Sequence, residues 1–316
     1  MSEEFREILK QRARGPSHLG ELDPALCERA MELILAGEAT PAQIGGFLLV
    51  GRAGRNFDGK LRTFNVGAAA SLVAAAAGGR TLLLGNENTP PKAGRTVFDA
   101  LRGLGVSAPQ TLSEAEASLA ERGFAATSVE HYLPEFHALL PLRWEMARRT
   151  VLSVCEKMVS PAPDSPMMVG VSHKSFLMTI SRALMNLGVE HALVYQAIEG
   201  SDEAPLDGSS ALIRVRDGEL KEFTVIPESL GLTRATKAHI PWKGPDSEKE
   251  SLLAVLGGGG AEPVRALILY NAALRLWMED PELPLNAHLE RASGALDTGE
   301  AVRILGSFRR AVTIAG

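Results

Sequence analysis

The chain has 316 residues, of which 45% are hydrophobic and only 5% aromatic, so it can bury a large core built mainly from small and aliphatic side chains. The formal net charge of -5 excludes a protein that is positively charged over its whole surface, but it is compatible with a local basic groove. The two cysteines, Cys27 and Cys155, are too few for a disulfide framework or a cysteine zinc site, which favours a reducing, cytoplasmic location.

Residues 1–50 have the apolar spacing of short amphipathic helices. Asp23 followed by Pro24 is a typical helix start. Gly37 can end that helix, and Thr40 can cap the next one. Helices of this length are suited to a small bundle or to a dimer interface. The expected helices span residues 4–12, 25–36 and 44–50.

From about residue 51 onward, strands and helices alternate, which is typical of a largely parallel sheet. The longest apolar run, residues 66–79, is rich in alanine and glycine and too short to span a bilayer, so we expect no contact with a membrane. Gly105 is a typical end for the helix that precedes it. In this part of the chain we expect helices at 68–77 and 96–104, and strands at 80–84 and 123–128.

The next part of the chain begins with a helical stretch, residues 133–158, which is interrupted at Pro134 and Pro141. The dipeptide Asp217-Gly218 is a strong signal for a hairpin between two strands. Beyond these features we expect strands at 167–171, 191–196, 212–216 and 222–225, and helices at 176–187 and 264–277.

A set of motifs runs in order along nearly the whole chain. They are residues 38–48, Thr63-Phe64-Asn65 with the alanine-rich stretch 68–78, Gly85-Asn86 with Lys92-Ala93-Gly94, residues 141–162, Gly200-Ser201-Asp202-Glu203, and Asn271-Ala272-Ala273. In this order they resemble the motifs of the anthranilate phosphoribosyltransferase family, which is a family of glycosyltransferases. The variant at 88–94, Asn-Thr-Pro-Pro-Lys-Ala-Gly, resembles a divergent second-type branch of that family, some members of which bind nucleic acid.

The resemblance implies an α/β fold of the nucleoside phosphorylase and phosphoribosyltransferase type. In that fold a small helical domain built from two chain segments lies beside a larger α/β domain with a mainly parallel central sheet, and the active site lies in the cleft between them. Here the helical domain corresponds to residues 1–52 and 132–160, and the α/β domain to residues 53–131 and 161–316. Members of the family dimerise through the helical part, so we expect a homodimer.

The resemblance also implies a substrate and a metal. The family transfers a phosphoribosyl group from phosphoribosyl pyrophosphate to an aromatic amine with the help of Mg²⁺, so we expect this compound or a similar phosphorylated pentose, together with Mg²⁺. Asp202 and Glu203 are the candidate magnesium ligands, because Mg²⁺ prefers carboxylate oxygens. The candidates for holding phosphates are Arg55, Lys60, Asn65 and Lys92, and those for orienting the acceptor are Asn86 and Arg149.

The sequence departs from the family pattern at several candidate positions. Residues 54–60 replace a compact glycine loop, so Arg55 and Lys60 can bind phosphate through their charges instead of through backbone amides. Gly67 stands where the family has a hydroxyl side chain, and Leu84 stands where it has a histidine. We therefore do not expect anthranilate itself to be the acceptor.

Two functional hypotheses follow. The first is a phosphoribosyltransferase-like enzyme, a pentosyltransferase whose catalysis is mainly electrostatic, with the metal stabilising the departing pyrophosphate. The second is a non-catalytic homologue that binds nucleic acid in a basic groove of the dimer. The cations that motivate it form three clusters: Lys10, Arg12 and Arg14; Arg52, Arg55, Lys60 and Arg62; and Arg143, Arg148 and Arg149.

Each candidate residue also has a purely structural interpretation, which the sequence leaves open. The two acidic candidates can be a solvated pair in a loop, and the cationic candidates can be exposed charges on turns and helix surfaces. Asn86 can be a plain turn former after Gly85.

Overall fold

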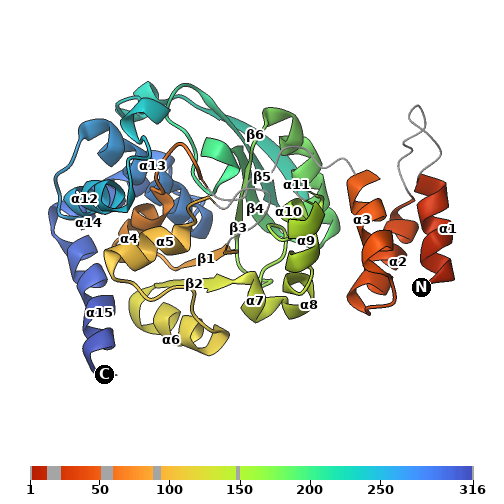
Figure 1. Cartoon of the computed structure of the whole chain (residues 1–316). Coiled ribbons are helices and arrows are strands. Elements are labelled where there is room, and N and C mark those ends of the chain that lie inside the picture. Colours follow the sequence, from red (N-terminus) through yellow and green to blue (C-terminus); the bar gives the residue numbers. More distant parts are fainter. Residues whose placement is uncertain (1, 13–22, 51–59, 88–93, 147–149, 315–316) are drawn as a thin grey trace.

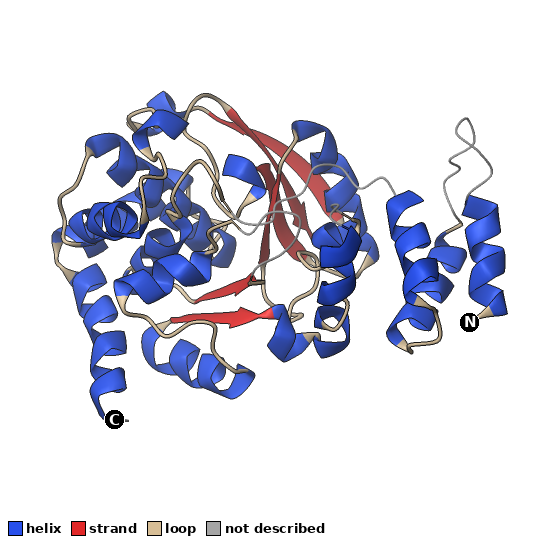
Figure 2. Ribbon diagram, in the orientation of Figure 1, coloured by secondary structure: helices blue, strands red, loops and turns tan. Residues whose placement is uncertain are grey.

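Helices surround two groups of strands in this protein (Figure 1, Figure 2). The computed structural model describes residues 2–12, 23–50, 60–87, 94–146 and 150–314. Within these residues, no helix combines the length and the apolar character that crossing a membrane requires.

The chain begins with three helices that pack on one another, as the sequence predicts. They are α1 (Glu3–Arg12), α2 (Pro24–Leu35) and α3 (Pro41–Val50). Asp23 caps α2 by accepting a hydrogen bond of 2.8 Å from the backbone amide of Ala25. The rings of Phe5 and Phe47 meet edge to face, with their centroids 5.7 Å apart, and join α1 to α3.

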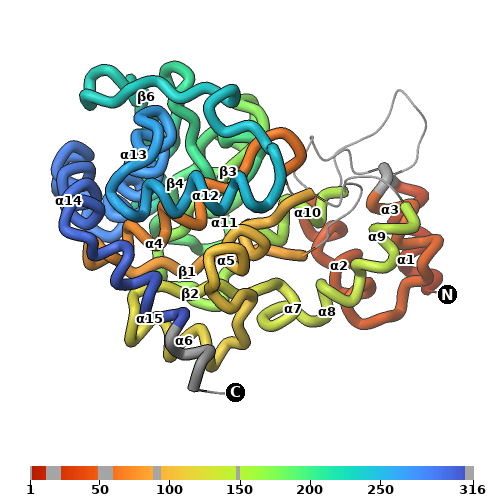
Figure 3. Tube along the Cα trace, turned by 60° about the vertical axis from the view of Figure 1, so that its left-hand side comes forward, coloured from red at the N-terminus to blue at the C-terminus, as the bar shows by residue number. Residues whose placement is uncertain are grey.

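Four short helices from the middle of the chain pack against this N-terminal group. They are α7 (Val129–Tyr132), α8 (Pro134–His137), α9 (Leu140–Met146) and α10 (Leu152–Cys155). Phe136 and Leu152 are buried in the same hydrophobic cluster as Phe5 and Leu48. Figure 3 shows α9 lying next to the N-terminal helices. Two segments far apart in sequence therefore share one core.

The strands form two hydrogen-bonded groups among the described residues. The first contains β1 (Thr81–Gly85) and β2 (Phe124–Ser128), which pair in parallel; the second has the order β3 (Met167–Val171), β4 (His191–Gln196), β5 (Ser210–Arg216) and β6 (Glu219–Val225). β3 and β4 are parallel, whereas β5 and β6 add an antiparallel edge. The predicted hairpin at Asp217-Gly218 is confirmed, with both residues at positive φ. The α/β class is confirmed, with the parallel pairing confined to β1–β2 and β3–β4.

The remaining helices cover the strands. They are α4 (Gly67–Ala76), α5 (Val97–Leu104), α6 (Leu112–Arg122), α11 (Leu177–Asn186), α12 (Pro245–Leu256), α13 (Glu262–Glu279), α14 (Leu285–Asp297) and α15 (Glu300–Ile314). Almost every residue of α4 is buried, because its alanines allow neighbouring helices to approach closely. Gly105 ends α5 in the left-handed conformation, with φ of 86°, as predicted. No helix was predicted at α6, α7, α12, α14 or α15, although the pair Thr111 and Glu114 forms a capping box at the start of α6.

Gly170 on β3 allows the closest backbone approach in the described part of the fold. A Cβ atom at this position would lie 1.8 Å from the carbonyl oxygen of Ser201 and 2.7 Å from the Cβ of Ala197. Any side chain here would therefore displace the loop that follows β4.

We expect Gly170→Ala to lower the free energy of unfolding by roughly 2–3 kcal/mol, because overpacking against backbone cannot be relieved by a rotamer change. The matched control is Gly208→Ala, where no atom lies within 4 Å of the added Cβ and where we expect a change below about 1 kcal/mol. Urea denaturation of both variants measures the difference. Equal free energies of unfolding for the two variants would contradict the close approach of Gly170 to Ser201.

Candidate functional site

The loop after β4, residues 197–203, directs three carboxylates at the segment 60–67. The first is that of Glu199, whose side chain accepts hydrogen bonds from the amides of Leu61 and Arg62 at 3.4 and 3.2 Å and from the hydroxyl of Thr63 at 2.7 Å. Glu199 itself has a positive φ of 51°, which is uncommon for a residue with a side chain. The loop thus holds the segment in place before any ligand is present.

The second carboxylate belongs to Glu203 and forms a buried ion pair with Lys60. Glu203 has no exposed surface and Lys60 is 2% exposed, and the ammonium contacts Oε2 of the glutamate. Lys60 Nζ also donates to the carbonyl of Phe64 at 2.9 Å, and Oε1 of Glu203 accepts from the amide of Gly67 at 2.8 Å. Burial raises the pKa of Glu203, while the ammonium of Lys60 and the amide of Gly67 oppose that shift.

The third carboxylate, that of Asp202, pairs with Arg275 on α13. The distance between Nη2 of Arg275 and Oδ2 of Asp202 is 2.5 Å, and the guanidinium also donates to the Ser71 hydroxyl at 3.0 Å and to the Asn271 carbonyl at 2.9 Å. A Cβ atom on Gly67 would lie 2.9 Å from Oδ2 of Asp202. The glycine at position 67 therefore makes room for this carboxylate.

Asn65 is held by a buried carboxylate that the sequence did not reveal. Its backbone amide donates to Oε1 of Glu248 on α12 at 2.8 Å, and its side-chain Nδ2 donates to the same oxygen at 3.2 Å. Nη2 of Arg95 donates to the other oxygen of Glu248 at 2.8 Å, and its guanidinium lies 4.9 Å from the ring centre of Trp242. Arg95 Nε is buried and has no hydrogen-bond partner among the described residues.

A cavity of about 810 Å³ lies between β1 and β3 and adjoins these ion pairs. Four of the predicted site residues line it: Lys60, Asn65, Asn86 and Asp202. Its volume lies within the range of small-molecule sites, which run from roughly 300 to 1,000 Å³. Predicted site residues that lie far apart in the sequence thus line one cavity.

One end of this cavity is lined by Asn86, Tyr132 and Glu156. Asn86 Nδ2 donates to Oε2 of Glu156 at 3.4 Å, and Glu156 is also paired with the buried Arg143 at 3.0 Å. Because a carboxylate only accepts hydrogen bonds, this contact fixes which way the Asn86 amide is turned. Among the described residues, neither Asn86 Oδ1 nor the Tyr132 hydroxyl has a partner. Burial, followed by the charge of Glu156, raises the pKa of Tyr132.

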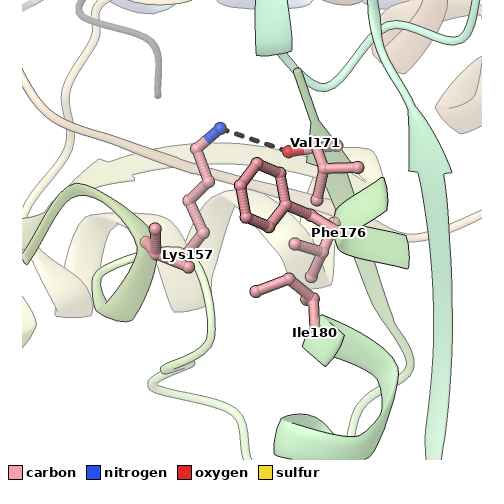
Figure 4. Close-up of a pocket in the computed structure, with 7 residues that line it drawn as sticks. Lys157, Val171, Phe176 and Ile180 are labelled. Atoms are coloured by element: carbon pink, nitrogen blue, oxygen red, sulfur yellow. Dashed lines mark hydrogen bonds between the residues drawn. The ribbon is translucent and has the colours of Figure 1, made fainter. Parts of the chain in front are cut away.

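Lys157 connects β3 to the loop that carries the three acids. Its ammonium donates to the carbonyls of Gly170 and Gly200 at 3.2 and 2.5 Å. Figure 4 shows its side chain beside a small apolar pocket with Val171, Phe176 and Ile180. That pocket, about 20 Å³, has the size of a single water, so it is too small for a substrate.

The structure therefore divides the predicted site residues into three sets. The first set is Lys60 and Glu203, which form an ion pair with each other. The second set is Asn65, Asn86 and Asp202, which line the same cavity as Lys60. The third set, Arg55, Lys92 and Arg149, lies outside the described residues. Within the described ranges, no cluster of three or more histidine, cysteine, aspartate or glutamate side chains is arranged to hold a metal ion.

Sequence reasoning missed Glu199, Glu248, Arg275 and Glu156. Only Arg275 had a usable signal: it follows Asn271 of the recognised late motif by four residues, and side chains at that spacing share one face of a helix. Asn271 itself holds the loop by accepting from the amide of Ala204 at 2.7 Å and donating to its carbonyl at 2.9 Å.

We expect Glu203→Gln to lower the free energy of unfolding by about 3–5 kcal/mol, because it leaves the ammonium of Lys60 buried without a countercharge. The double variant Lys60→Met/Glu203→Gln should recover at least half of that loss, since it removes both charges. The exposed pair of Arg6 and Glu3 supplies the control Glu3→Gln, with an expected effect below about 1 kcal/mol. If Glu203→Gln is no less stable than Glu3→Gln, the buried ion pair is absent.

Known proteins are similar to this chain in sequence and in fold. The family described as "Glycosyl transferase family, a/b domain" matches residues 58–302. The anthranilate phosphoribosyltransferase of Symbiobacterium thermophilum is 29% identical over 342 aligned positions, covering 96% of this chain and 97% of that protein. That of Paracidovorax citrulli is 30% identical over 256 positions, covering 80% and 72%.

Two solved structures have the same fold. The anthranilate phosphoribosyltransferase of Thermus thermophilus has a TM-score of 0.80 at 23% identity, covering 98% of this chain and 99% of that one. The enzyme of Saccharomyces cerevisiae in complex with PRPP and Mg has a TM-score of 0.79 at 18% identity, covering 98% of each chain. Together with the sequence matches, these likenesses show that the chain belongs to the anthranilate phosphoribosyltransferase family of glycosyl transferases.

Proposed function

We propose that this protein binds phosphoribosyl pyrophosphate, or a similar phosphorylated pentose, and transfers the pentosyl phosphate group to an acceptor. The observation that carries the proposal is the cavity of about 810 Å³, which is lined by Lys60, Asn65, Asn86 and Asp202. Asn65, Asn86 and Asp202 come from motifs that resemble those of the transferases. Their convergence on one hollow of suitable size supports a substrate site there.

Magnesium enters this proposal as part of the substrate. Mg²⁺ keeps several of its waters and is usually held by one or two carboxylates together with substrate phosphates. Asp202 fits that role, because its side chain is 34% exposed and its Oδ1 accepts no hydrogen bond from the described residues. Glu203 does not fit, since both its oxygens are bonded and it is fully buried. A phosphate-bound Mg²⁺ neutralises charge on the departing pyrophosphate.

Arg95 is a described cation that can meet a phosphate, because it lines the cavity and its side chain is 26% exposed. Its Nη2 is bonded to Glu248, so the contact with a phosphate falls to the rest of the guanidinium. Lys60 is buried and bonded to Glu203, so its part is to position the segment that ends at Asn65. Arg55 and Lys92 stay predictions for the same phosphate contact.

The acceptor end of the cavity does not favour anthranilate. Anthranilate carries a carboxylate, and the carboxylate of Glu156 lines the cavity beside Asn86. The charge of Glu156 is balanced by Arg143, so Glu156 acts on an acceptor through Asn86. Asn86 spends a donor on Glu156, which leaves its carbonyl oxygen, an acceptor, without a partner among the described residues. We propose that the acceptor offers an N–H group and carries no carboxylate next to it.

We also propose that residues 1–52 and 132–160 form a helical domain through which two copies of the chain associate. Support comes from the hydrophobic cluster that the two segments share. Leu35 and Trp144 add exposed apolar surface on these helices, at 44% and 41% exposure.

Binding of nucleic acid by such a dimer stays a prediction, as does membership of the second-type branch. Three of the cations that motivate the nucleic-acid hypothesis, Lys10, Lys60 and Arg143, each form an ion pair with a glutamate.

Calorimetric titration with phosphoribosyl pyrophosphate and Mg²⁺ tests the proposal. We expect saturable binding by the wild type and an affinity roughly 10- to 100-fold weaker for Arg95→Gln, the loss typical for one hydrogen bond to a charged group. The control is Arg234→Gln, which changes an exposed arginine paired with Glu228 and should bind like the wild type. Absence of heat with the wild type would refute the proposed function.

A further inference from the structure

We infer that Lys60 takes the place that a divalent metal ion would occupy at the acidic pair, so that the free protein holds no metal there and needs none. The pair consists of Asp202 and Glu203, the residues that the sequence marked as magnesium ligands. In the structure each carboxylate is already bonded to a cation of the chain itself, Glu203 to Lys60 and Asp202 to Arg275. Two negative charges meet two positive charges, and the group is neutral.

The surroundings of Glu203 exclude a hydrated ion. Lys60 Nζ contacts Oε2, the amide of Gly67 donates to Oε1 at 2.8 Å, and the Ser201 hydroxyl donates to Oε2 at 3.4 Å. Glu203 has no exposed surface at all. Mg²⁺ demands near-octahedral oxygen ligation and gives up its waters reluctantly, so it cannot reach this carboxylate unless the ammonium leaves.

Lys60 is fixed in its place by contacts on both sides. Its ammonium donates to the carbonyl of Phe64 at 2.9 Å, and its backbone amide and carbonyl bridge to Arg95. Glu199 holds the three residues that follow Lys60. Both the backbone and the ammonium of the lysine are therefore held at the acidic pair.

Arg275 acts in the same way on the other carboxylate. It is anchored to Ser71 and to the carbonyl of Asn271, and it bonds Oδ2 of Asp202. Gly67 provides the space that this carboxylate occupies. Among the described contacts, only Oδ1 of Asp202 stays open, which suits one contact to an ion that arrives bound to a phosphate. The contact between Asp202 and a phosphate-bound ion rests on the proposed function. The inference about metal binding by the free chain does not.

Removal of the lysine charge should uncover a metal site. Lys60 lines the large cavity, so the space left by its ammonium opens toward solvent. Without the Lys60 ammonium, Oε2 of Glu203 would lie beside Asp202 without its cationic partner. The structure thus predicts that the loss of Lys60 produces a gain of divalent cation binding.

The experiment is a titration with Mn²⁺ in the absence of any substrate, followed by the electron paramagnetic resonance signal of the free ion. We expect no binding to the wild type that depends on Glu203. Lys60→Met should bind Mn²⁺ roughly tenfold or more tightly than the wild type, because one repelling charge beside the ligands is gone. The double variant Lys60→Met/Glu203→Gln should lose the gain. Lys10→Met breaks an exposed lysine–glutamate pair on α1 and should gain nothing.

Lys60→Gln serves as a second variant in case the methionine disturbs folding, and the melting temperature of each variant is recorded with and without Mn²⁺. A rise in melting temperature on Mn²⁺ addition for either Lys60 variant, absent in the wild type, supports the inference. Two results overturn it: wild-type Mn²⁺ binding that Glu203→Gln abolishes, or folded Lys60 variants that bind Mn²⁺ no better than the wild type. Because no substrate is present, a failure of phosphoribosyl pyrophosphate to bind would leave either result unaffected.

Discussion

The contact between the Lys60 ammonium and the Glu203 carboxylate joins residues 143 positions apart and lies almost wholly out of solvent. It fastens the segment that leads into α4 to the loop that leaves β4, and those two segments form part of the wall of the cavity. Removal of either charge leaves the other buried without a partner, which is strongly destabilising. The pair acts together with two neighbouring contacts, Glu248 with Asn65 and Arg275 with Asp202, to fix this side of the cavity.

Two glycines make the arrangement possible, because each lets one part of the loop approach the rest of the protein. Gly67 leaves room for the carboxylate of Asp202, and Gly170 leaves room for the backbone at Ser201. The absence of a side chain at Gly67 therefore lets the Asp202 carboxylate lie where it pairs with Arg275.

Local signals predicted much of the fold, and the resemblance predicted which segments meet. The helix start at Asp23, the helix end at Gly105 and the hairpin at Asp217-Gly218 each depend on a few neighbouring residues, which pattern reasoning can see. Pairings across the chain cannot be found in this way. Arg275 and Asp202 are 73 positions apart, and nothing in either neighbourhood indicates the other. The sequence therefore identified four of the described residues that line the cavity, but not that Asp202 and Glu203 are paired with cations of the chain.

Hydrogen exchange at the Gly67 amide tests most directly whether the chain's own cation organises the site. This amide donates to Glu203 and stays bonded only while the carboxylate is held in place. Exchange is measured by NMR, first with a chelator and then with excess Mg²⁺. The ion pair of Lys60 and Glu203 predicts slow exchange at the same rate in both conditions. Fast exchange in the chelator that slows when Mg²⁺ is added would contradict it, because a metal ion and not Lys60 would then hold the carboxylate.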